Sequence, residues 1–386
     1  MPPGTRRNRK GQLAEAAADL FGRRGYHAVG VNDIAAAAGV TGPALYRHFQ
    51  NKQDVLGFVL LSGIDKLTDR LAPLVSACAA DPAAFEPLLR ATAEVSIEQR
   101  ALTALWRWEG RNLHEADKKE IRRRVGALLG QVVAGMRLLR RPMTPAEAEL
   151  TCFAALSVFG SVGDHRVTLP MPVFAPLLAG LADAVIRAPL ATGTVSANWR
   201  VGPTQTRREE LLTAATRLFR DRGFLAVSME DIGAATGIAG PSVYRHFASK
   251  SDILLAASRR MADRLRWGLE DSLASASSAA DALQRLTRSY VDTVMRSDDL
   301  IAVYTTELAN LPERDGRELR ALQRGYVAEW VRLLREAQPD LSEPAARVTV
   351  HAALTIVNDL PRTARLASRP ALAAELTGLA VAVLGV

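Results

Sequence analysis

Four side chains that can bind anions or the edges of nucleobases recur at one spacing in two parts of the chain. Tyr46, Arg47 and His48 are followed by Lys52. The same residue types return 198 positions later, as Tyr244, Arg245, His246 and Lys250. Arginine forms paired hydrogen bonds with a phosphate or a guanine edge, and tyrosine and lysine donate to phosphate oxygens. The repetition predicts two sites for a polyanion.

The repetition extends far beyond these residues. The same offset, without a gap, pairs Leu13 with Leu211 near the start and Leu181 with Leu379 near the end. A constant offset between similar segments is the signature of a duplicated architecture. We therefore expect two tandem units in the 386-residue chain, the first of which ends near residue 188.

The segment before each repeated set has the periodicity of a helix. Leu13, Ala17 and Phe21 follow one another at intervals of four residues, so they lie on one helical face. Because glycine favours helix ends, we expect this first helix to end at Gly22 and Gly25.

Two shorter helices should follow. The first is expected over residues 32–38, where Gly39 breaks it. Thr41 can cap the next helix, and Pro43 fits its first turn because an N–H there would be unpaired. Two short helices joined by a glycine-centred turn form a helix-turn-helix, whose second helix enters the major groove of DNA.

The second of these two helices should bury one face and expose the other. Leu45 and Phe49 are spaced for the core. Ala44, Arg47 and His48 should then face outward. Tyr46 should lie at the edge of the helix, with its ring packed and its hydroxyl free to reach a phosphate. Lys52 begins the next helix, where its charge and the helix N-terminus would both suit a phosphate. A solvated basic surface is the alternative for Arg47 and Lys52, and their recurrence in the second copy argues against it.

Charge and composition agree with two polyanion-binding modules. The net charge is +8, and residues 1–56 hold eight Arg or Lys against four acids. Residues 199–252 hold eight against six, so the two modules account for +6 of the net charge of +8. The two cysteines lack metal-site spacing, and there is no apolar leader or membrane-spanning run. We expect a cytoplasmic protein with no cofactor, no metal and no membrane association.

Three patterns, LxxAAxxLFxxxGY, DIAxxAGV and LYxHFxxKxxL, run through residues 9–56 and, with substitutions, through residues 207–254. Both segments therefore resemble the DNA-binding domain of TetR-type transcriptional regulators. The whole chain resembles actinobacterial repressors with two such modules, a group that includes the mycobacterial repressor of a mammalian-cell-entry operon. The resemblance implies an all-α fold of two tandem TetR-like units, each a three-helix head followed by a helical domain for effector binding and pairing.

The resemblance also implies that both heads contact a double-stranded DNA operator. With the positions that flank each motif, the expected DNA-facing residues are Thr41, Pro43, Ala44, Tyr46, Arg47, His48 and Lys52 in the first head, and Ser228, Pro241, Ser242, Tyr244, Arg245, His246 and Lys250 in the second. The heads differ chemically. In the second head Ser228 can form a capping box at its helix N-terminus, whereas the first head has Gly30 at the matching position. In the first head Thr41 can cap the following helix, whereas the second head has Ala239 there. We therefore expect an imperfect operator that is bound in one orientation.

The domain plan follows from the repeat. The heads are expected at residues 1–56 and 206–254, the helical domains at 57–188 and 255–386, and a linker at 189–205. Thr144-Pro145 and Ser342-Glu343-Pro344 open helices that resemble the first pairing helix of the family, and residues 172–188 and 370–385 would form the second. Since both pairing surfaces lie in one chain, the halves can pair intramolecularly as a pseudo-dimer, with homo-oligomers optional.

Aromatic and polar residues of the large domains are candidates for an effector site. They are Trp106, Arg107, Trp108, Asn112, Phe153 and Phe159 in the first unit, and Tyr304, Thr305, Asn310, Trp330, His351 and Asn358 in the second. Core packing is the alternative for each of them. The resemblance implies a repressor released by a small apolar effector, such as a fatty acyl thioester or a sterol-derived compound.

Two other classes of function remain to be weighed. An enzyme is disfavoured, because the six histidines are scattered and no hydrolase, metalloprotease or nucleotide-binding motif lies in its required context. A sequence-independent architectural DNA-binding protein would share the basic heads. Competition by unrelated DNA distinguishes that alternative from a sequence-specific regulator.

Overall fold

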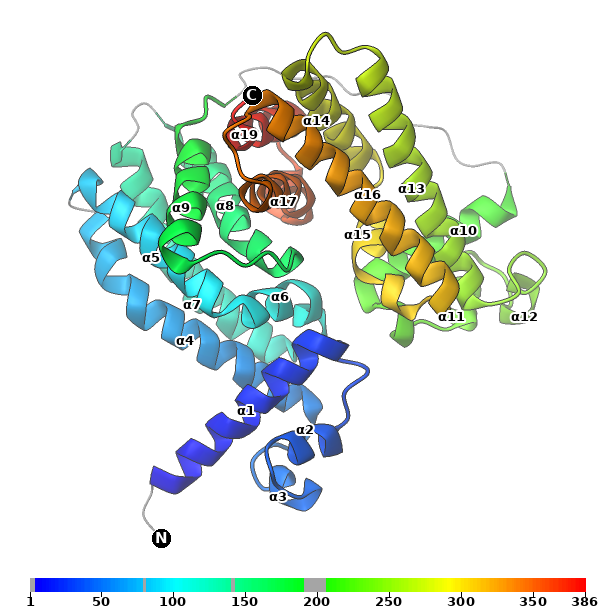
Figure 1. Ribbon diagram of the computed structural model, residues 1–386. Coiled ribbons are helices and arrows are strands. Elements are labelled where there is room, and N and C mark those ends of the chain that lie inside the picture. The colour runs from blue at the N-terminus through cyan, green and yellow to red at the C-terminus, as the bar shows by residue number, and fades with distance from the viewer. Residues whose placement is uncertain (1–3, 79–80, 140–142, 191–205) are drawn as a thin grey trace. The chain divides into compact units, whose positions relative to one another are not determined.

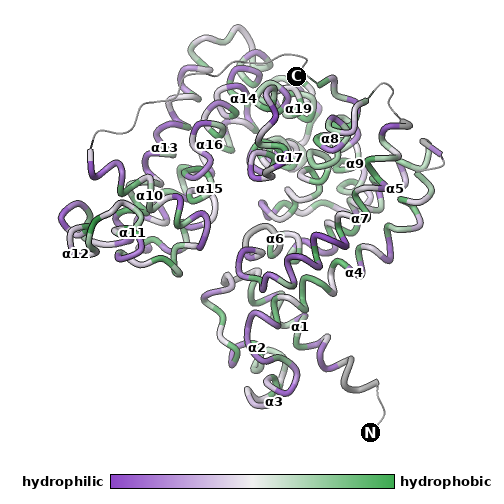
Figure 2. The backbone as a smooth tube through the Cα atoms, turned by 180° about the vertical axis from the view of Figure 1, so that it is seen from behind, coloured by the Kyte–Doolittle hydropathy of each residue, from purple (hydrophilic) through white to green (hydrophobic). Residues whose placement is uncertain are grey.

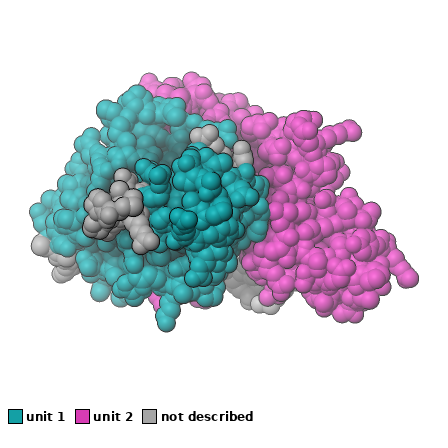
Figure 3. Space-filling view, turned by 90° about the horizontal axis from the view of Figure 1, so that it is seen from below, with its two compact units in different colours: residues 1–187 teal, residues 188–386 magenta. Residues whose placement is uncertain are grey.

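The protein is all-helical, as the sequence predicts. The computed structural model describes residues 4–78, 81–139, 143–190 and 206–386, so most of the expected linker lies outside the described residues. Every regular element within these ranges is a helix (Figure 1). The chain divides into two compact units, Met1–Arg187 and Ala188–Val386, which Figure 3 distinguishes by colour.

The first unit consists of a small head and a larger helical domain. Its α-helices are α1 (Gly4–Arg24), α2 (Val31–Ala37), α3 (Gly42–Tyr46), α4 (Lys52–Cys78), α5 (Phe85–Glu98), α6 (Arg100–Glu109), α7 (Glu115–Leu139), α8 (Pro145–Gly160) and α9 (Met171–Arg187). Helices α1 to α3 form the head at the start of the long helix α4 (Figure 1). In the larger domain, α4 packs against α5 and α7, and α9 packs against α5 and α8.

The second unit repeats this order of α-helices, with one additional short helix, α18, before the last. Its α-helices are α10 (Arg207–Arg222), α11 (Met229–Ala235), α12 (Gly240–Val243), α13 (Lys250–Ala274), α14 (Ala279–Arg296), α15 (Asp298–Thr306), α16 (Glu313–Ala337), α17 (Glu343–Asp359), α18 (Ala364–Ala367) and α19 (Leu372–Leu384). Helices α10 to α12 form its head, and α13 begins with Lys250 as α4 begins with Lys52.

Each head folds around the apolar residues that the sequence places on one face. Leu13, Ile34 and Leu45 are fully buried in the first head, and hydrophobic and hydrophilic residues alternate along its helices (Figure 2). Leu211 and Val243 are fully buried at the matching positions of the second head. Helices shorter than about 12 residues are marginal in water on their own, so this shared core holds the short helices in place.

The first helix is longer than expected. Helix α1 continues through Gly22 and ends at Arg24, where Gly25 adopts a positive φ of 78°. The prediction that Gly22 ends the helix was wrong, because a glycine with negative φ can continue a helix. Its cost relative to alanine is only about 1 kcal/mol.

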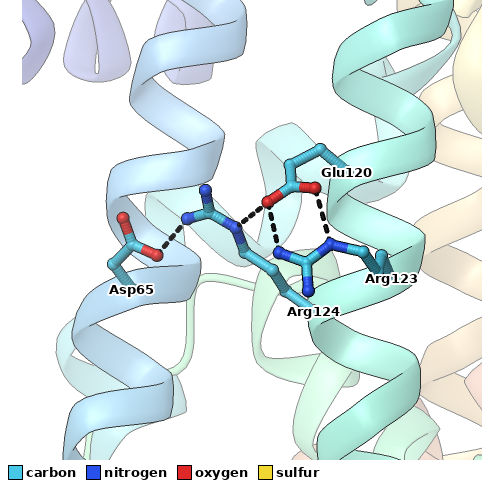
Figure 4. A network of polar contacts seen from close by, with 4 residues as sticks. All are labelled: Asp65, Glu120, Arg123 and Arg124. Carbon is cyan, nitrogen blue, oxygen red and sulfur yellow. Dashed lines mark hydrogen bonds and ion pairs between the residues drawn. The ribbon is translucent and has the colours of Figure 1, made fainter.

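A charged network joins α4 to α7 in the first large domain (Figure 4). Arg124 contacts Asp65 on α4 and Glu120 on its own helix, and Arg123 also donates to Glu120. These hydrogen bonds lower the pKa of Glu120 to about 2. The network ties together two helices of the large domain without involving the head.

The helices expected to pair the two halves begin where the sequence predicts. Thr144 Oγ1 accepts a hydrogen bond from the Glu147 amide at 3.2 Å, and the Glu147 carboxylate accepts one from the Thr144 amide at 2.7 Å. At the start of α17, Ser342 Oγ accepts a hydrogen bond from the Ala345 amide. Within each unit the two expected pairing helices pack together, α8 with α9 and α17 with α19. None of the helices in the described ranges is both long and apolar enough to cross a bilayer.

Candidate nucleic-acid interface

The turn of each helix-turn-helix has the same backbone conformation. Gly39 and Gly237 have φ values of 67° and 73°, a region that favours glycine. After the turn, the Val40 amide donates to the Ala35 carbonyl at 2.9 Å, and the Ile238 amide donates to the Gly233 carbonyl at 2.9 Å. The turn therefore sets the direction of the short helix that follows, α3 or α12.

The two short helices are shorter than expected, since α3 ends at Tyr46 and α12 ends at Val243, so several repeated motif residues follow the helices directly. Leu45 and Phe49 are buried as expected. The remaining motif positions of the two heads are Arg47, Arg245, Thr41, Pro43, Pro241 and Ser228, which are exposed, and Ala44, Ser242, His48 and His246, which are half-buried. Tyr46 and Tyr244 are 55% and 51% exposed, so their rings are less packed than the sequence suggests. Each head thus presents a tyrosine and an arginine to solvent beside a histidine.

The N-caps differ between the heads, although not entirely as expected. Ser228 Oγ accepts from the Asp231 amide at 3.0 Å, and the Asp231 carboxylate accepts from the Ser228 amide at 2.8 Å, which confirms the capping box. The prediction for Thr41 was wrong, because its side chain makes no cap hydrogen bond. Pro43 has no N–H to donate, and the Ala44 amide donates to the Thr41 carbonyl instead.

Lys52 and Lys250 are bound within the heads. Lys52 Nζ donates to the carbonyls of Tyr26 and Val29 at 2.8 and 2.9 Å, and it lies 4.3 Å from the centre of the Tyr26 ring. Lys250 Nζ makes the equivalent bonds at 2.7 and 2.6 Å to the loop after α10, above the Phe224 ring. Burial lowers the pKa of both lysines. Two of the three N–H donors of each ammonium are therefore used inside the head, and the expected phosphate contact stays a prediction.

Matching carboxylates, the half-buried Glu109 and the buried Glu307, lie at the C-terminal ends of α6 and α15 in the two large domains. Glu109, at the end of α6, accepts from the Tyr26 amide at 2.8 Å and from the Asn112 side chain at 2.8 Å. In the second unit, Asn310 donates to the Glu307 carboxylate at 2.8 Å. Asn112, expected near an effector, thus lies at the junction between large domain and head, and Asn310 makes the matching bond in the second unit. The constant offset pairs Glu109 with Glu307, and that pairing was the only sequence signal for this junction.

One effector candidate of the second unit, Trp330, lies in a cluster of aromatic side chains. Trp330 is 1% exposed, and its ring centre lies 6.0 Å from that of Tyr290 and 6.2 Å from that of Tyr326. The Tyr290 hydroxyl donates to Asn358 at 3.0 Å. Tyr304, on α15, is also buried, and burial raises its pKa. The sequence reading missed both tyrosines: Tyr326 lies four residues before Trp330 on α16, whereas Tyr290 reaches the cluster only through the packing of α14 on α16.

The other effector candidates are less closely grouped. Phe159 is buried and Phe153 half-buried on α8, while the side chains of Trp106 and Arg107 lie outside the described residues. His351, on α17, is largely enclosed, and burial lowers its pKa to about 4. Among the residues that the structure describes, no group of histidine, cysteine and carboxylate side chains could hold a metal ion.

Two helix-turn-helix heads, each followed by a helical domain, define the class of protein. A family model described as "Bacterial regulatory proteins, tetR family" matches residues 13–57 and 211–257, and one described as "Tetracyclin repressor-like, C-terminal domain" matches residues 276–362. The transcriptional repressor KstR2 of Mycobacterium tuberculosis H37Rv is 31% identical over 149 residues, which cover 36% of this chain and 74% of that protein. The chain belongs to the TetR family.

Other relatives match over shorter segments. KstR2 of Mycolicibacterium smegmatis is 30% identical over 35% of this chain, and the transcriptional activator FasR of the same species is 33% identical over 23%. The matches span 66% and 41% of the length of those relatives. The solved structure of KstR2 from Mycobacterium tuberculosis aligns with a TM-score of 0.40 at 24% identity, over 48% of this chain and 96% of that one.

Proposed function

We propose that the protein is a sequence-specific DNA-binding transcriptional regulator that uses both heads of one chain. The observation that carries this proposal is the duplicated exposure of Tyr46 with Arg47, and of Tyr244 with Arg245, at the ends of the short helices that follow matching turns. A recognition helix reads base edges in the major groove, and arginine is the side chain that most often pairs with guanine.

The two heads act as a pseudo-dimer in this proposal. Both units carry the helix pair expected for pairing, so the two halves of one chain can take the place of two identical subunits. Identical subunits related by a two-fold axis read a palindrome. Here Ser242 can hydrogen-bond a base edge where Ala44 can only touch a thymine methyl. We therefore expect an operator with imperfect two-fold symmetry, to which the protein binds in one orientation.

A small apolar effector would release the DNA. The cluster around Trp330 supports the proposal of an effector site, because it combines aromatic rings with the polar atoms of Tyr290 and Asn358. Sites for small ligands are mostly apolar with a few polar groups. An acyl thioester or a sterol-derived compound fits the resemblance to TetR-type repressors. A thermal-shift screen with such compounds, followed by a DNA-affinity measurement with each hit, tests the effector proposal.

The proposed function is tested by DNA binding at several salt concentrations. The probe is the protein's own promoter region, and unrelated DNA of equal length is the competitor. Each phosphate that is neutralised adds about 0.9 to the slope of log affinity against log salt. We expect a steep slope and weak competition. Equal competition by unrelated DNA would identify an architectural DNA-binding protein instead. Genome-wide mapping of bound sites would show whether a mammalian-cell-entry operon is the target.

A further inference from the structure

The two heads align without a gap, yet they are fastened to their large domains by different residues. In the first helix of each head, Glu209 takes the position of Gly11, and Arg220 takes the position of Gly22. Glycine has no side chain that could form an ion pair. Helix α10 can therefore make two attachments that α1 cannot.

The first attachment joins α10 to the long helix α13. Arg260 donates from both terminal nitrogens to the two carboxylate oxygens of Glu209, at 2.5 and 2.7 Å. Such a two-point pair is stronger than a single contact and also fixes orientation. Both side chains are about one third exposed. Their counterparts in the first unit are Gly11 and Ser62, which cannot form this pair.

The second attachment joins the other end of α10 to the large domain. Arg220 contacts Asp298, at 2.9 Å, and Asp299 in the first turn of α15. The counterparts of these two acids are Arg100 and Ala101. Arg100 donates instead to the Val167 carbonyl at 2.6 Å, within its own large domain. Helix α10 is thus held near both of its ends.

The helix-turn-helix of the second head is also tied to α10. Arg207 donates to the Thr236 carbonyl at the end of α11, and Arg208 donates to the His246 carbonyl just after α12, both at 3.1 Å. Cations at helix C-termini stabilise the exposed carbonyl groups. In the first head, Arg9 bonds Gln12 on its own helix, and Lys10 lies over the rings of Phe49 and Phe58.

We propose that the second head is held more firmly in its DNA-binding orientation in the free protein than the first head, which gains more order on the DNA. Glu209, Arg220 and their partners are the positioning residues. A group that is already ordered loses less conformational entropy on binding, so its affinity is higher. The second head therefore binds its half-site more tightly and first. This inference rests on the proposed function, because it assumes that each head binds a half-site.

Amide hydrogen exchange of the free, full-length chain tests the difference in order. We expect residues 207–247 to exchange at least about tenfold more slowly than residues 9–49, which corresponds to a factor of ten in the local opening equilibrium. Operator DNA should then slow exchange more in the first head than in the second. Equal exchange in the two free heads would overturn the proposal.

Variants show whether the attachments cause the difference. Glu209→Arg should speed exchange in α10, and Glu209→Arg with Arg260→Glu should restore slow exchange, since the reversed pair has the same geometry. Arg266→Ser is the matched control, because Arg266 pairs only with Asp263 and Glu270 of its own helix among the contacts described. In the first unit, Gly11→Glu with Ser62→Arg should slow exchange in α1. No response of α10 or α1 to these changes would contradict the proposal.

Binding to separate half-sites completes the test. Duplexes that each carry one half-site of the footprinted region should differ about tenfold in affinity, with the half-site of the second head bound more tightly. Glu209→Arg should reduce this difference, and the reversed pair should restore it. Equal affinities, or a difference that Glu209→Arg leaves unchanged, would overturn the inference. If no sequence-specific DNA binding is found, the proposed function fails, while the exchange experiment still reports on the order of the heads.

Discussion

At the scale of single residues, each head holds one exposed cation and one cation that is hydrogen-bonded inside it. Arg47 and Arg245 are exposed beside a tyrosine, where they are free to meet a base edge or a phosphate. Lys52 and Lys250 bond to the loop that precedes the helix-turn-helix. The sequence motif contains both kinds of cation and does not distinguish them, because the partners of the lysines are backbone carbonyl groups.

Replacing Lys52 with methionine should destabilise the first head and leave phosphate contacts unchanged. The variant removes two hydrogen bonds from a charged donor, so we expect a loss of about 1.5 to 3 kcal/mol in the free energy of unfolding. Urea unfolding followed by circular dichroism measures this loss. Lys250→Met is the matched variant of the second head. If stability is unchanged while the slope of log affinity against log salt falls by about 0.9, the lysine contacts a phosphate instead.

His351 should make the second unit sensitive to mild acid. Burial, together with the charge of Arg347, lowers its pKa to about 4 from an ordinary value of 6.5. Between these values the unfolded chain binds the proton more readily, so stability falls as the pH decreases, by at most about 1.4 kcal/mol per pH unit. His351→Gln should lose this contribution. Urea unfolding at pH 7 and pH 5 measures it, and an identical pH dependence in both proteins would contradict the assignment.

At the scale of elements, periodicity predicted the heads well. Leu13, Ala17 and Phe21 are buried on one face of α1, and Gly39 forms the turn, because both follow from local backbone geometry. The links between elements were not predictable in this way. The contact of Glu109 with the Tyr26 amide joins residues 83 positions apart, and it depends on how α6 packs against α1.

Helix α1 should gain stability from alanine at either of its interior glycines. A Cβ at Gly11 would meet no atom within 4 Å, and one at Gly22 would meet only the Ala101 Cβ at 3.7 Å. Each substitution should raise the free energy of unfolding of the first unit by about 0.8 to 1.0 kcal/mol. Gly39→Ala is the control, because its φ of 67° should make alanine destabilising. Urea unfolding that shows no gain for Gly11→Ala would argue against a continuous helix there.

At the scale of the whole molecule, duplication within one chain changes what an operator can be. Apart from the additional helix α18, the two units have the same order of α-helices. Their heads differ at Gly30 and Ser228, at Ala44 and Ser242, and in their attachments. A dimer of identical chains cannot have such differences. The proposed pseudo-dimer would therefore bind its DNA in one orientation.

One chain should suffice for the proposed pairing of the two units through α8, α9, α17 and α19. Light scattering of a dilute solution should give a mass near 41.6 kDa, the mass of a single chain. The physical reason is that both pairing surfaces are tethered, so the effective concentration of one for the other is high. A species of twice this mass that persists at every dilution would show that the pairing helices associate between chains.

The central claim, that each head reads its own half of one operator, is tested most directly by footprinting two single variants. Arg47→Ala should remove protection from one half-site and Arg245→Ala from the other, at a cost of about 1 to 3 kcal/mol if each arginine reads a guanine. Both variants should keep the fold of the parent, since both side chains are exposed. The same footprint for both variants, or an operator with perfect two-fold symmetry, would contradict the claim.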